Sequence, residues 1–551
     1  MSNGLLINYA GVPHEMSSLF PDNGLAALAG VLQEANQMVR ILDFSTTETI
    51  HEVYGSDIRK ALRSLAPKIF GGGRLDDLEI ADLRQIDSEI QVSESAFIHR
   101  IIDELNNDIV KNKVIWAGFK LWMGSIRQSM EIAAALKKKN PGLKIFGGGP
   151  SVDIFQHAIL KKYPFIDALV FAEGEKALPL LIEWAEGKGD LFSIPNILYS
   201  NGRDIVSNPI ERIKNLDKQP FPIYDPDIYP AMEGDRKMKI LCFDDSRGCP
   251  MGCAFCPGTN KFGTTRIEKS SDRCIAELSY LKEKYDVRYF RFSGSNTSAK
   301  LLNEVAEKLI AKKLDILFAV FSSATGLSAE SVHKLATAGL YSIFVGIESA
   351  NRFQRRNHLG KKLSLDRLKD VFEACRQSDV FISTSMIYPA PFSNRKILEE
   401  NINFLVDGLK GYENCSVALY PAGLYPYTKW FDNMESFGFS IECPSKEAYI
   451  EEALDYRYNI VLPRYLWKEL PYTLNGKSFK EMLMETNTLA EALKAHGILP
   501  YLVEANLMMA PVLGYRHYKE FALESSIAFF GGDAERLEAW NREFNRAQMK
   551  K

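Results

Sequence analysis

The stretch "RGCPMGCAFCPG" (residues 247–258) places three cysteines, Cys249, Cys253 and Cys256, within eight positions. Their spacing is C-x3-C-x2-C, and the glycines and prolines around them favour the tight turns that let three thiolates converge. Cysteines gathered this way in a long chain with few other cysteines indicate metal binding rather than a disulfide framework.

A zinc site is one alternative for these three cysteines, but a structural zinc ion takes four ligands, usually as two Cys-x2-Cys-like pairs or with histidine. Cys242 falls inside an expected strand, Cys274 has the helical spacing of a core residue, and none of the eight histidines lies between residues 158 and 332. A thioredoxin-type redox pair would need only two cysteines. Three thiolates instead fit a [4Fe-4S] cluster in which one iron stays open for a substrate or cofactor.

Strand-like apolar runs alternate with helical patterns around and after this loop, which predicts parallel βα units. Two of the intervening helices are expected at residues 270–285 and 328–339. About six units suggest a (β/α)6 partial barrel, with the cysteine loop after its first strand. The expected strands are residues 238–246, 287–295, 314–323, 341–350, 380–389 and 415–423.

The first part of the chain has the same alternation, which predicts a separate α/β domain with a Rossmann-like parallel sheet. In such sheets the ligand lies beyond the carboxyl ends of the strands, which here end at Gly118, Gly147–Gly149 and Glu173–Glu175. Helices are expected at residues 23–37 and 129–142. The expected strands are residues 5–11, 38–44, 113–119, 143–149 and 167–174.

The 551 residues are enough for about three domains of roughly 150 residues each. Residues 191–235 are rich in Pro and Asp and are expected to resist regular structure. We therefore predict a first domain over residues 1–215 with a linker to about 235, a barrel domain over 236–440 and a helical C-terminal domain over 441–551.

The cysteine spacing, with the aromatic Phe255 before the last cysteine, resembles the radical S-adenosylmethionine (SAM) superfamily. The resemblance implies that SAM chelates the open iron and is cleaved by one electron to a 5′-deoxyadenosyl radical. It also implies SAM contacts from Phe255, from Ser293 and Gly294, where the family's usual Glu is absent, and from Glu348 and Ser349 in "VGIESA" (345–350). The alternative for Glu348 is a surface carboxylate at the end of a strand.

The first domain resembles the cobalamin-binding domain of one large class of radical SAM methyltransferases, through "WAGFKLWMGSIRQSMEIAAALKKKNPGLKIFGGGP" and "IDALVFAEGEKALPLLIEW". The alternative is a phosphate-binding or ligand-free Rossmann-like domain, although no G-x-G-x-x-G follows the first strand. The sequence also lacks the D-x-H motif with which some cobalamin domains supply a histidine ligand to cobalt. The lower ligand of cobalt is therefore a side chain from another position, or water, or absent. The cobalamin contacts that the resemblance implies are Gly118, Trp122, Gly147, Gly148, Gly149, Glu173 and Gly174.

The sequence thus predicts a cobalamin-dependent radical SAM methyltransferase that acts on an unactivated carbon or phosphorus centre of a small-molecule intermediate. Enzymes with the same cofactors that catalyse cyclisation, rearrangement or oxidation stay open as alternatives, as does an iron–sulfur sensor. The formal net charge of −3, with 46% hydrophobic and 25% charged residues, gives no sign of a nucleic-acid partner. The sequence contains no apolar run of about 18 residues, so we expect no membrane span. We expect a cytoplasmic location and an electron donor such as flavodoxin or ferredoxin.

Overall fold

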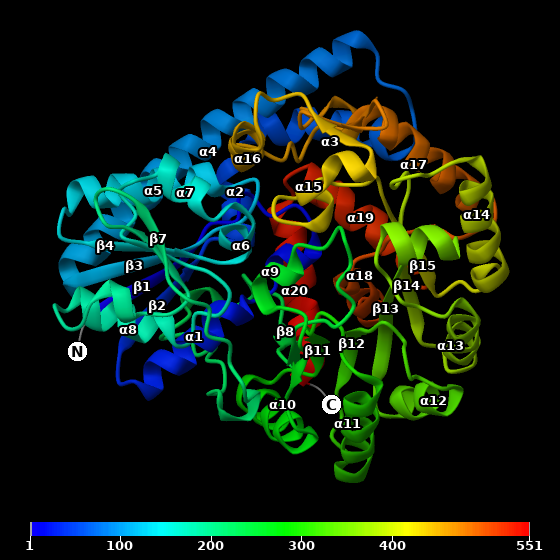
Figure 1. The fold of residues 1–551 in the computed structure, drawn as a ribbon, viewed down its shortest axis with the longest axis horizontal. Coiled ribbons are helices and arrows are strands. Elements are labelled where there is room, and N and C mark those ends of the chain that lie inside the picture. The colour runs from blue at the N-terminus through cyan, green and yellow to red at the C-terminus, as the bar shows by residue number, and fades with distance from the viewer. Residues whose placement is uncertain (1–2, 550–551) are drawn as a thin grey trace.

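The computed structural model describes residues 3–549 of the protein and contains two seven-stranded sheets, one in the first predicted domain and one mainly in the second (Figure 1). The first sheet has the order β2-β1-β3-β4-β5-β6-β7 and is parallel from β2 to β5. Its strands are β1 (Asn3–Asn8), β2 (Met38–Asp43), β3 (Val114–Lys120), β4 (Lys144–Gly148), β5 (Ala168–Val170), β6 (Ile197–Ser200) and β7 (Ile205–Ser207). The Rossmann-like prediction is therefore confirmed.

The region expected to resist regular structure contributes β6 and β7, which pair antiparallel and extend the sheet. The prediction for residues 191–235 was wrong here, because Asn201-Gly202 supplies a hairpin turn between two short apolar runs. Gly202 has φ +90°, a conformation that glycine adopts without steric cost.

Eight helices of the first domain are described: α1 (Asn23–Glu34), α2 (Thr47–Val53), α3 (Ser56–Phe70), α4 (Asp77–Asn112), α5 (Ile126–Lys139), α6 (Pro150–Phe155), α7 (His157–Lys162) and α8 (Ala177–Ala185). Helix α4 is 36 residues long and begins with a capping box in which Asp76 and Glu79 satisfy each other's backbone N–H groups. Asp22 caps α1 by accepting from the Leu25 N–H.

The second sheet is the predicted partial barrel, with six parallel strands in chain order and a short seventh strand at the edge. The strands are β8 (Ile240–Phe243), β11 (Tyr289–Phe292), β12 (Leu317–Phe321), β13 (Leu340–Glu348), β14 (Phe381–Ile387), β15 (Cys415–Tyr420) and β19 (Leu499–Pro500). The helices between them are α10 (Ser271–Tyr285), α11 (Ala299–Lys312), α12 (Ala329–Thr337), α13 (Leu365–Gln377) and α14 (Arg395–Leu409).

The C-terminal region is helical, as predicted, but it also holds a small antiparallel sheet that the sequence did not reveal. Its strands are β16 (Phe439–Ile441), β17 (Tyr472–Leu474) and β18 (Lys477–Ser478). Its helices are α15 (Lys429–Asp432), α16 (Lys446–Leu454), α17 (Phe479–Lys494), α18 (Glu504–Val512), α19 (Tyr518–Phe530) and α20 (Ala534–Met549).

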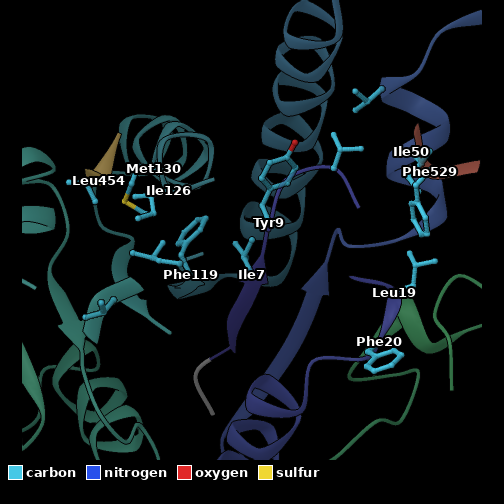
Figure 2. Packing of buried hydrophobic residues seen from close by; sticks show 14 of the residues in the cluster. Ile7, Tyr9, Leu19, Phe20, Ile50, Phe119, Ile126, Met130, Leu454 and Phe529 are labelled. Atoms are coloured by element: carbon cyan, nitrogen blue, oxygen red, sulfur yellow. The ribbon is translucent and has the colours of Figure 1, made fainter. Parts of the chain in front are cut away.

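The core of the first domain is completed by the C-terminal region. Figure 2 shows Leu454 beside Ile126 and Met130 of α5, and Phe529 beside Ile50 of α2. All of these side chains belong to one buried cluster that also includes residues of the barrel. The C-terminal helices therefore hold the first sheet against the barrel (Figure 1).

A buried ion pair fixes the start of the barrel domain to the end of β2. Lys237 Nζ lies 2.6 Å from Asp43 Oδ2, and both side chains are at most 1% exposed. The Tyr229 hydroxyl donates to the same carboxylate, and Asn8 Nδ2 donates to it at 2.8 Å. Breaking a buried pair of this kind leaves an uncompensated charge, so the contact fixes how the two sheets meet. Among the described helices, none combines the length and the hydropathy that crossing a bilayer requires.

Candidate functional site

The three cysteines of the motif lie in the loop between β9 (Ser246–Arg247) and β10 (Ile267–Glu268), at the carboxyl end of the barrel's first strand. The loop, residues 248–266, is pinned from outside by two segments distant in sequence. The Ala254 N–H donates to the Leu359 carbonyl at 2.9 Å, and the Trp430 N–H donates to the Ala254 carbonyl at 3.1 Å. These bonds hold Cys253 and its neighbours in place without any bound group.

All three thiols are free and half-buried. Burial raises the pKa of Cys253 to about 12 and also raises the pKa of Cys256, so a bound cation is needed to keep both as thiolates. Asn296 Nδ2 lies 3.7 Å from Cys249 Sγ. In the described part of the chain, no three His, Cys, Asp or Glu side chains gather as ligands of a single ion. In a [4Fe-4S] cluster each thiolate binds a different iron, and this donor set fits that group.

A buried lysine, Lys361, lies beside the cysteines and was missed by sequence reasoning, since no motif marks it. Its Nζ lies 2.9 Å from Glu348 Oε1. Burial opposes the charge on Lys361, but the attraction of Glu348 and Cys253 outweighs burial and raises the pKa of the lysine. The site therefore holds a fixed positive charge that favours anionic sulfur.

Glu348 ends β13 with φ +67° and is 6% exposed. The alternative of a surface carboxylate is therefore wrong. Its second oxygen accepts from Ser385 Oγ at 2.9 Å, so the carboxylate is held by β14 as well as by Lys361. Ser349 is fully buried, and its hydroxyl accepts from the Asn351 N–H at 3.2 Å. A conformation that costs a non-glycine residue energy is common at sites with a functional constraint.

Ser293 and Gly294 follow β11 and contact the end of β8. The Ser293 hydroxyl donates to the Phe243 carbonyl at 3.0 Å, and the Gly294 N–H donates to Asp245 Oδ1 at 2.9 Å. A Cβ at Gly294 would lie 2.2 Å from Ser246 Oγ, so only glycine fits. Phe255, the fifth residue expected to contact SAM, packs on Trp430 with ring centroids 5.6 Å apart.

A cavity of about 290 Å³ lies between the first sheet and the barrel. Six of the seven residues expected to contact cobalamin line it: Gly118, Gly147, Gly148, Gly149, Glu173 and Gly174. Trp122 is not among the lining residues; its indole N–H donates to Asn8 Oδ1 at 2.9 Å. Ser293 lines the same cavity from the barrel side. The residues expected to contact two different cofactors thus meet at one space.

The floor of the cavity is made of glycines and apolar side chains. Parallel pairing of β3 with β4 sets Gly118 against Phe146 and Lys120 against Gly148. Gly149 has φ +95°, and a Cβ there would come within 3.0 Å of the Lys120 side chain. Such a floor admits a large flat ligand close to the backbone, which fits a corrin ring. No histidine is found among the described residues that line the cavity.

The barrel side of the cavity is strongly polar, and sequence reasoning missed its main residue, Arg247. Its guanidinium binds Glu173 at 2.8 Å and Glu175 at 2.6 Å in the first domain, and Asp244 at 2.7 Å in the barrel. Burial disfavours charge on Asp244, but Arg247 outweighs it and lowers the pKa of that carboxyl. The position of Arg247, two residues before Cys249, was the available signal.

Asp153 and Lys261 also line the cavity and were not predicted. Burial raises the pKa of Asp153 to about 6, although its Oδ1 accepts from the Ala172 N–H. Burial lowers the pKa of Lys261, which follows the cysteine motif in α9 (Gly258–Phe262). No described carboxylate pairs with Lys261 within 4 Å, so its ammonium is available to an acceptor on a ligand.

Comparison with known proteins agrees with a site formed by two domains, one lining the cavity with glycines and one carrying the cysteine loop. The family model of the B12 binding domain matches residues 75–182, and that of the Radical SAM superfamily matches residues 245–405. The chain is 25% identical over 329 residues to the uncharacterized methyltransferase PH0819 of Pyrococcus horikoshii, covering 59% of this chain and 69% of that protein. It is 23% identical over 364 residues to the anaerobic magnesium-protoporphyrin IX monomethyl ester cyclase of Rubrivivax gelatinosus, covering 62% and 64%.

A solved structure shares the whole fold. The radical SAM methyltransferase TsrM from Kitasatospora setae, with cobalamin and a [4Fe-4S] cluster bound, superposes with a TM-score of 0.64 at 14% identity, over 98% of this chain and all of that one. The two matched domains, in this order and with the cysteine motif inside the radical SAM match, place the chain among enzymes. The chain therefore contains a B12-binding domain followed by a radical SAM domain.

Proposed function

We propose that the protein is a cobalamin-dependent radical SAM methyltransferase that methylates an unactivated carbon or phosphorus centre of a small-molecule intermediate. The observation that carries the proposal is the shared cavity. Glycines of the B12-binding domain form one wall, and Arg247, Lys261 and Ser293 of the radical SAM domain form another. Transfer between two cofactors requires that their sites adjoin. PH0819, a relative over more than half of this chain, is named a methyltransferase.

In this proposal Cys249, Cys253 and Cys256 hold the [4Fe-4S] cluster, and the residues for SAM are Phe255, Ser293, Gly294, Glu348 and Ser349. When bound, the cluster with SAM supplies a hydrogen-abstracting radical, and cobalamin supplies the methyl group.

Glu348 has a defined task here. Lys361 and Ser385 fix its carboxylate at the end of β13, so it keeps one orientation as SAM binds. A pre-oriented carboxylate accepts from ammonium or hydroxyl groups of a ligand without losing further side-chain entropy. Lys361 meanwhile keeps the sulfur ligands beside a positive charge.

The proposed contacts of cobalamin are the residues expected from the sequence that line the cavity: Gly118, Gly147, Gly148, Gly149, Glu173 and Gly174. Because no histidine lines the described cavity, we propose that cobalt has a weak lower ligand or none. A weak lower ligand should ease release of the methyl group. An electronic or EPR spectrum with the features of histidine-bound cobalamin would contradict this.

The proposal includes a small-molecule substrate, an electron donor such as flavodoxin or ferredoxin, and a cytoplasmic location. The location is supported by the cysteines, all eight of which are free, since a reducing compartment preserves free thiols. The tryptophan in a second TsrM structure is the substrate of that protein and supports only the class of small molecules for this one.

A second function deserves a test because the Rubrivivax relative, matched over 62% of this chain, is named a cyclase. The experiment is anaerobic reconstitution with iron, sulfide, hydroxocobalamin and SAM, followed by mass spectrometry of candidate substrates. A methyltransferase adds the mass of one CH2 group, and methyl-deuterated SAM labels the product. A cyclase or oxidase changes the mass without taking up label. Formation of 5′-deoxyadenosine without S-adenosylhomocysteine would overturn methylation.

A further inference from the structure

Beside the cysteine loop lies an exposed basic and aromatic surface that the site described above does not use. We define the Arg352 patch by three cations and three aromatic rings: Arg352, Arg356, Lys362, Phe353, His358 and Phe392. Phe353 is 66% exposed and Phe392 is 47% exposed. The His358 ring lies between the two phenyl rings, with centroids 5.3 Å from Phe353 and 4.2 Å from Phe392.

The patch is rigidly attached to the fold. Gln354 is buried, and its Nε2 donates to the Pro391 carbonyl at 2.9 Å and to Ser393 Oγ at 3.0 Å. Arg355 is also buried and donates to the Ser349 carbonyl at 2.8 Å. These bonds bring two segments together, so that Phe353 and Phe392 face the same solvent region. A surface fixed in advance loses little entropy when a partner binds.

The charge of the patch is local rather than general. Residues 352–362 include five Arg and Lys and no Asp or Glu, whereas the whole chain has a net charge of −3. Arg352, Arg356 and Lys362 are exposed, and none forms an ion pair with a described carboxylate. Glu400, held by Asn351 Nδ2 at 2.7 Å, lies at the border. Surface cations that form no ion pair within the chain attract an acidic partner and speed its association.

The patch is bonded directly to the cysteine loop. The Leu359 carbonyl accepts from the Ala254 N–H at 2.9 Å, next to Cys253, and the His358 carbonyl accepts from Trp430 Nε1 at 3.0 Å. Trp430 in turn packs on Phe255. A redox protein seated on the Arg352 patch would therefore sit one layer of chain from the sulfur ligands.

We propose that the Arg352 patch is the docking surface for an acidic flavodoxin that delivers the electron to the cluster. The inference rests on the proposed function, because it requires the cluster. Acidic groups around the flavin meet the three cations, and the apolar edge of the flavin packs on Phe353 and Phe392. One electron moves: the anionic flavin hydroquinone becomes the neutral semiquinone, the cluster passes from the 2+ to the 1+ state, and no bond or proton changes place.

The test uses the full chain with its reconstituted cluster and the variant R352E/R356E. Stopped-flow absorbance follows cluster reduction by flavodoxin hydroquinone, and labelled flavodoxin reports binding by fluorescence anisotropy. The matched control is K312E/K313E, which changes two exposed cations at the far end of α11, on the rim where the barrel strands begin. We expect the variant to lower the second-order rate constant at low salt about 10-fold or more, with the control unchanged.

Dithionite separates this proposal from the proposed function, since it needs no docking surface. It should reduce the cluster and drive SAM cleavage equally in all three proteins. Absence of SAM cleavage with dithionite in the wild type would overturn the proposed function, whereas an unchanged flavodoxin rate in R352E/R356E would overturn the docking surface. The proposal would also be overturned if R352E/R356E slowed cluster reduction by ferredoxin but not by flavodoxin. The same holds if the variant lost binding to single-stranded DNA but not to flavodoxin.

Discussion

Arg247 and Glu173 join the two cofactor-binding domains through a contact of 2.8 Å at the edge of the shared cavity. Arg247 lies two residues before Cys249, and Glu173 follows β5 of the B12-binding domain. The arginine is 10% exposed and binds Glu175 and Asp244 as well. The position of the cysteine loop is thereby tied to the wall of the cavity that we assign to cobalamin.

Arg247→Ala should destabilise the protein by about 3–5 kcal/mol, because it leaves three carboxylates near the cavity without their partner. Arg40→Ala is the matched control: its ion pair with Asp108 is partly exposed and should contribute less than about 1 kcal/mol. Urea denaturation of both variants measures the difference. Equal losses in the two variants would show that Arg247 does not couple the domains.

Glu348→Gln should weaken SAM binding about 10-fold or more in the reconstituted protein, because the amide loses the charge that Lys361 and Ser385 orient. Glu277→Gln is the control, since Glu277 of α10 pairs with Lys269, which follows β10, in an equally buried contact. Calorimetric titration with SAM should show normal affinity in Glu277→Gln. A normal affinity in Glu348→Gln would remove Glu348 from the site.

Gly148→Leu should abolish cobalamin binding while leaving the fold intact. Gly148 lines the cavity, and a Cβ there would find no atom nearer than 3.8 Å, so the larger side chain can enter the cavity. Gly142→Leu is the control. Gly142 does not line the cavity, and a Cβ at this position would meet no atom within 4 Å. Absorbance after gel filtration with hydroxocobalamin reports binding; a Gly148→Leu protein that stays red would contradict the assignment.

Asp153→Asn should change how stability depends on pH. The pKa of Asp153 is raised to about 6 in the folded protein, above its value of 3.8 when unfolded, so the folded state binds this proton more tightly. The stabilisation that this proton gives the folded state is complete below pH 3.8 and is lost as the pH rises through about 6. From pH 4 to 6.5 the free energy of unfolding of the wild type should fall relative to Asp153→Asn. Parallel curves for the two proteins would show that Asp153 is not buried as described.

The sheets were predictable because their strands are apolar runs with helices between them, a local pattern in the sequence. The cysteines were predictable for the same reason, since all three lie within eight positions. The hairpin of β6 and β7 was missed because the many Pro and Asp residues of 191–235 predicted irregular structure, although Asn201-Gly202 is a typical hairpin turn.

Lys361 and Asp153 could not be found in the sequence, because nothing near them in the chain marks them. Lys361 lies near Cys253 only because the segment after β13 packs on the cysteine loop, where the Leu359 carbonyl accepts from the Ala254 N–H. Asp153 enters the cavity from a six-residue helix. Trp122 shows the opposite error: it lies between two predicted contacts in sequence, yet its indole binds Asn8 instead of lining the cavity. Such side chains depend on tertiary contacts that no local pattern encodes.

The central claim is tested most directly by quantifying 5′-deoxyadenosine and S-adenosylhomocysteine by mass spectrometry in reduced, cobalamin-loaded wild type, Cys253→Ala and Cys443→Ala. Cys443 lies outside the motif and serves as the control thiol. The account predicts both products from the wild type and from Cys443→Ala, and no 5′-deoxyadenosine from Cys253→Ala, which should still bind cobalamin. Continued formation of 5′-deoxyadenosine by Cys253→Ala, or its formation by the wild type without S-adenosylhomocysteine, would contradict the account.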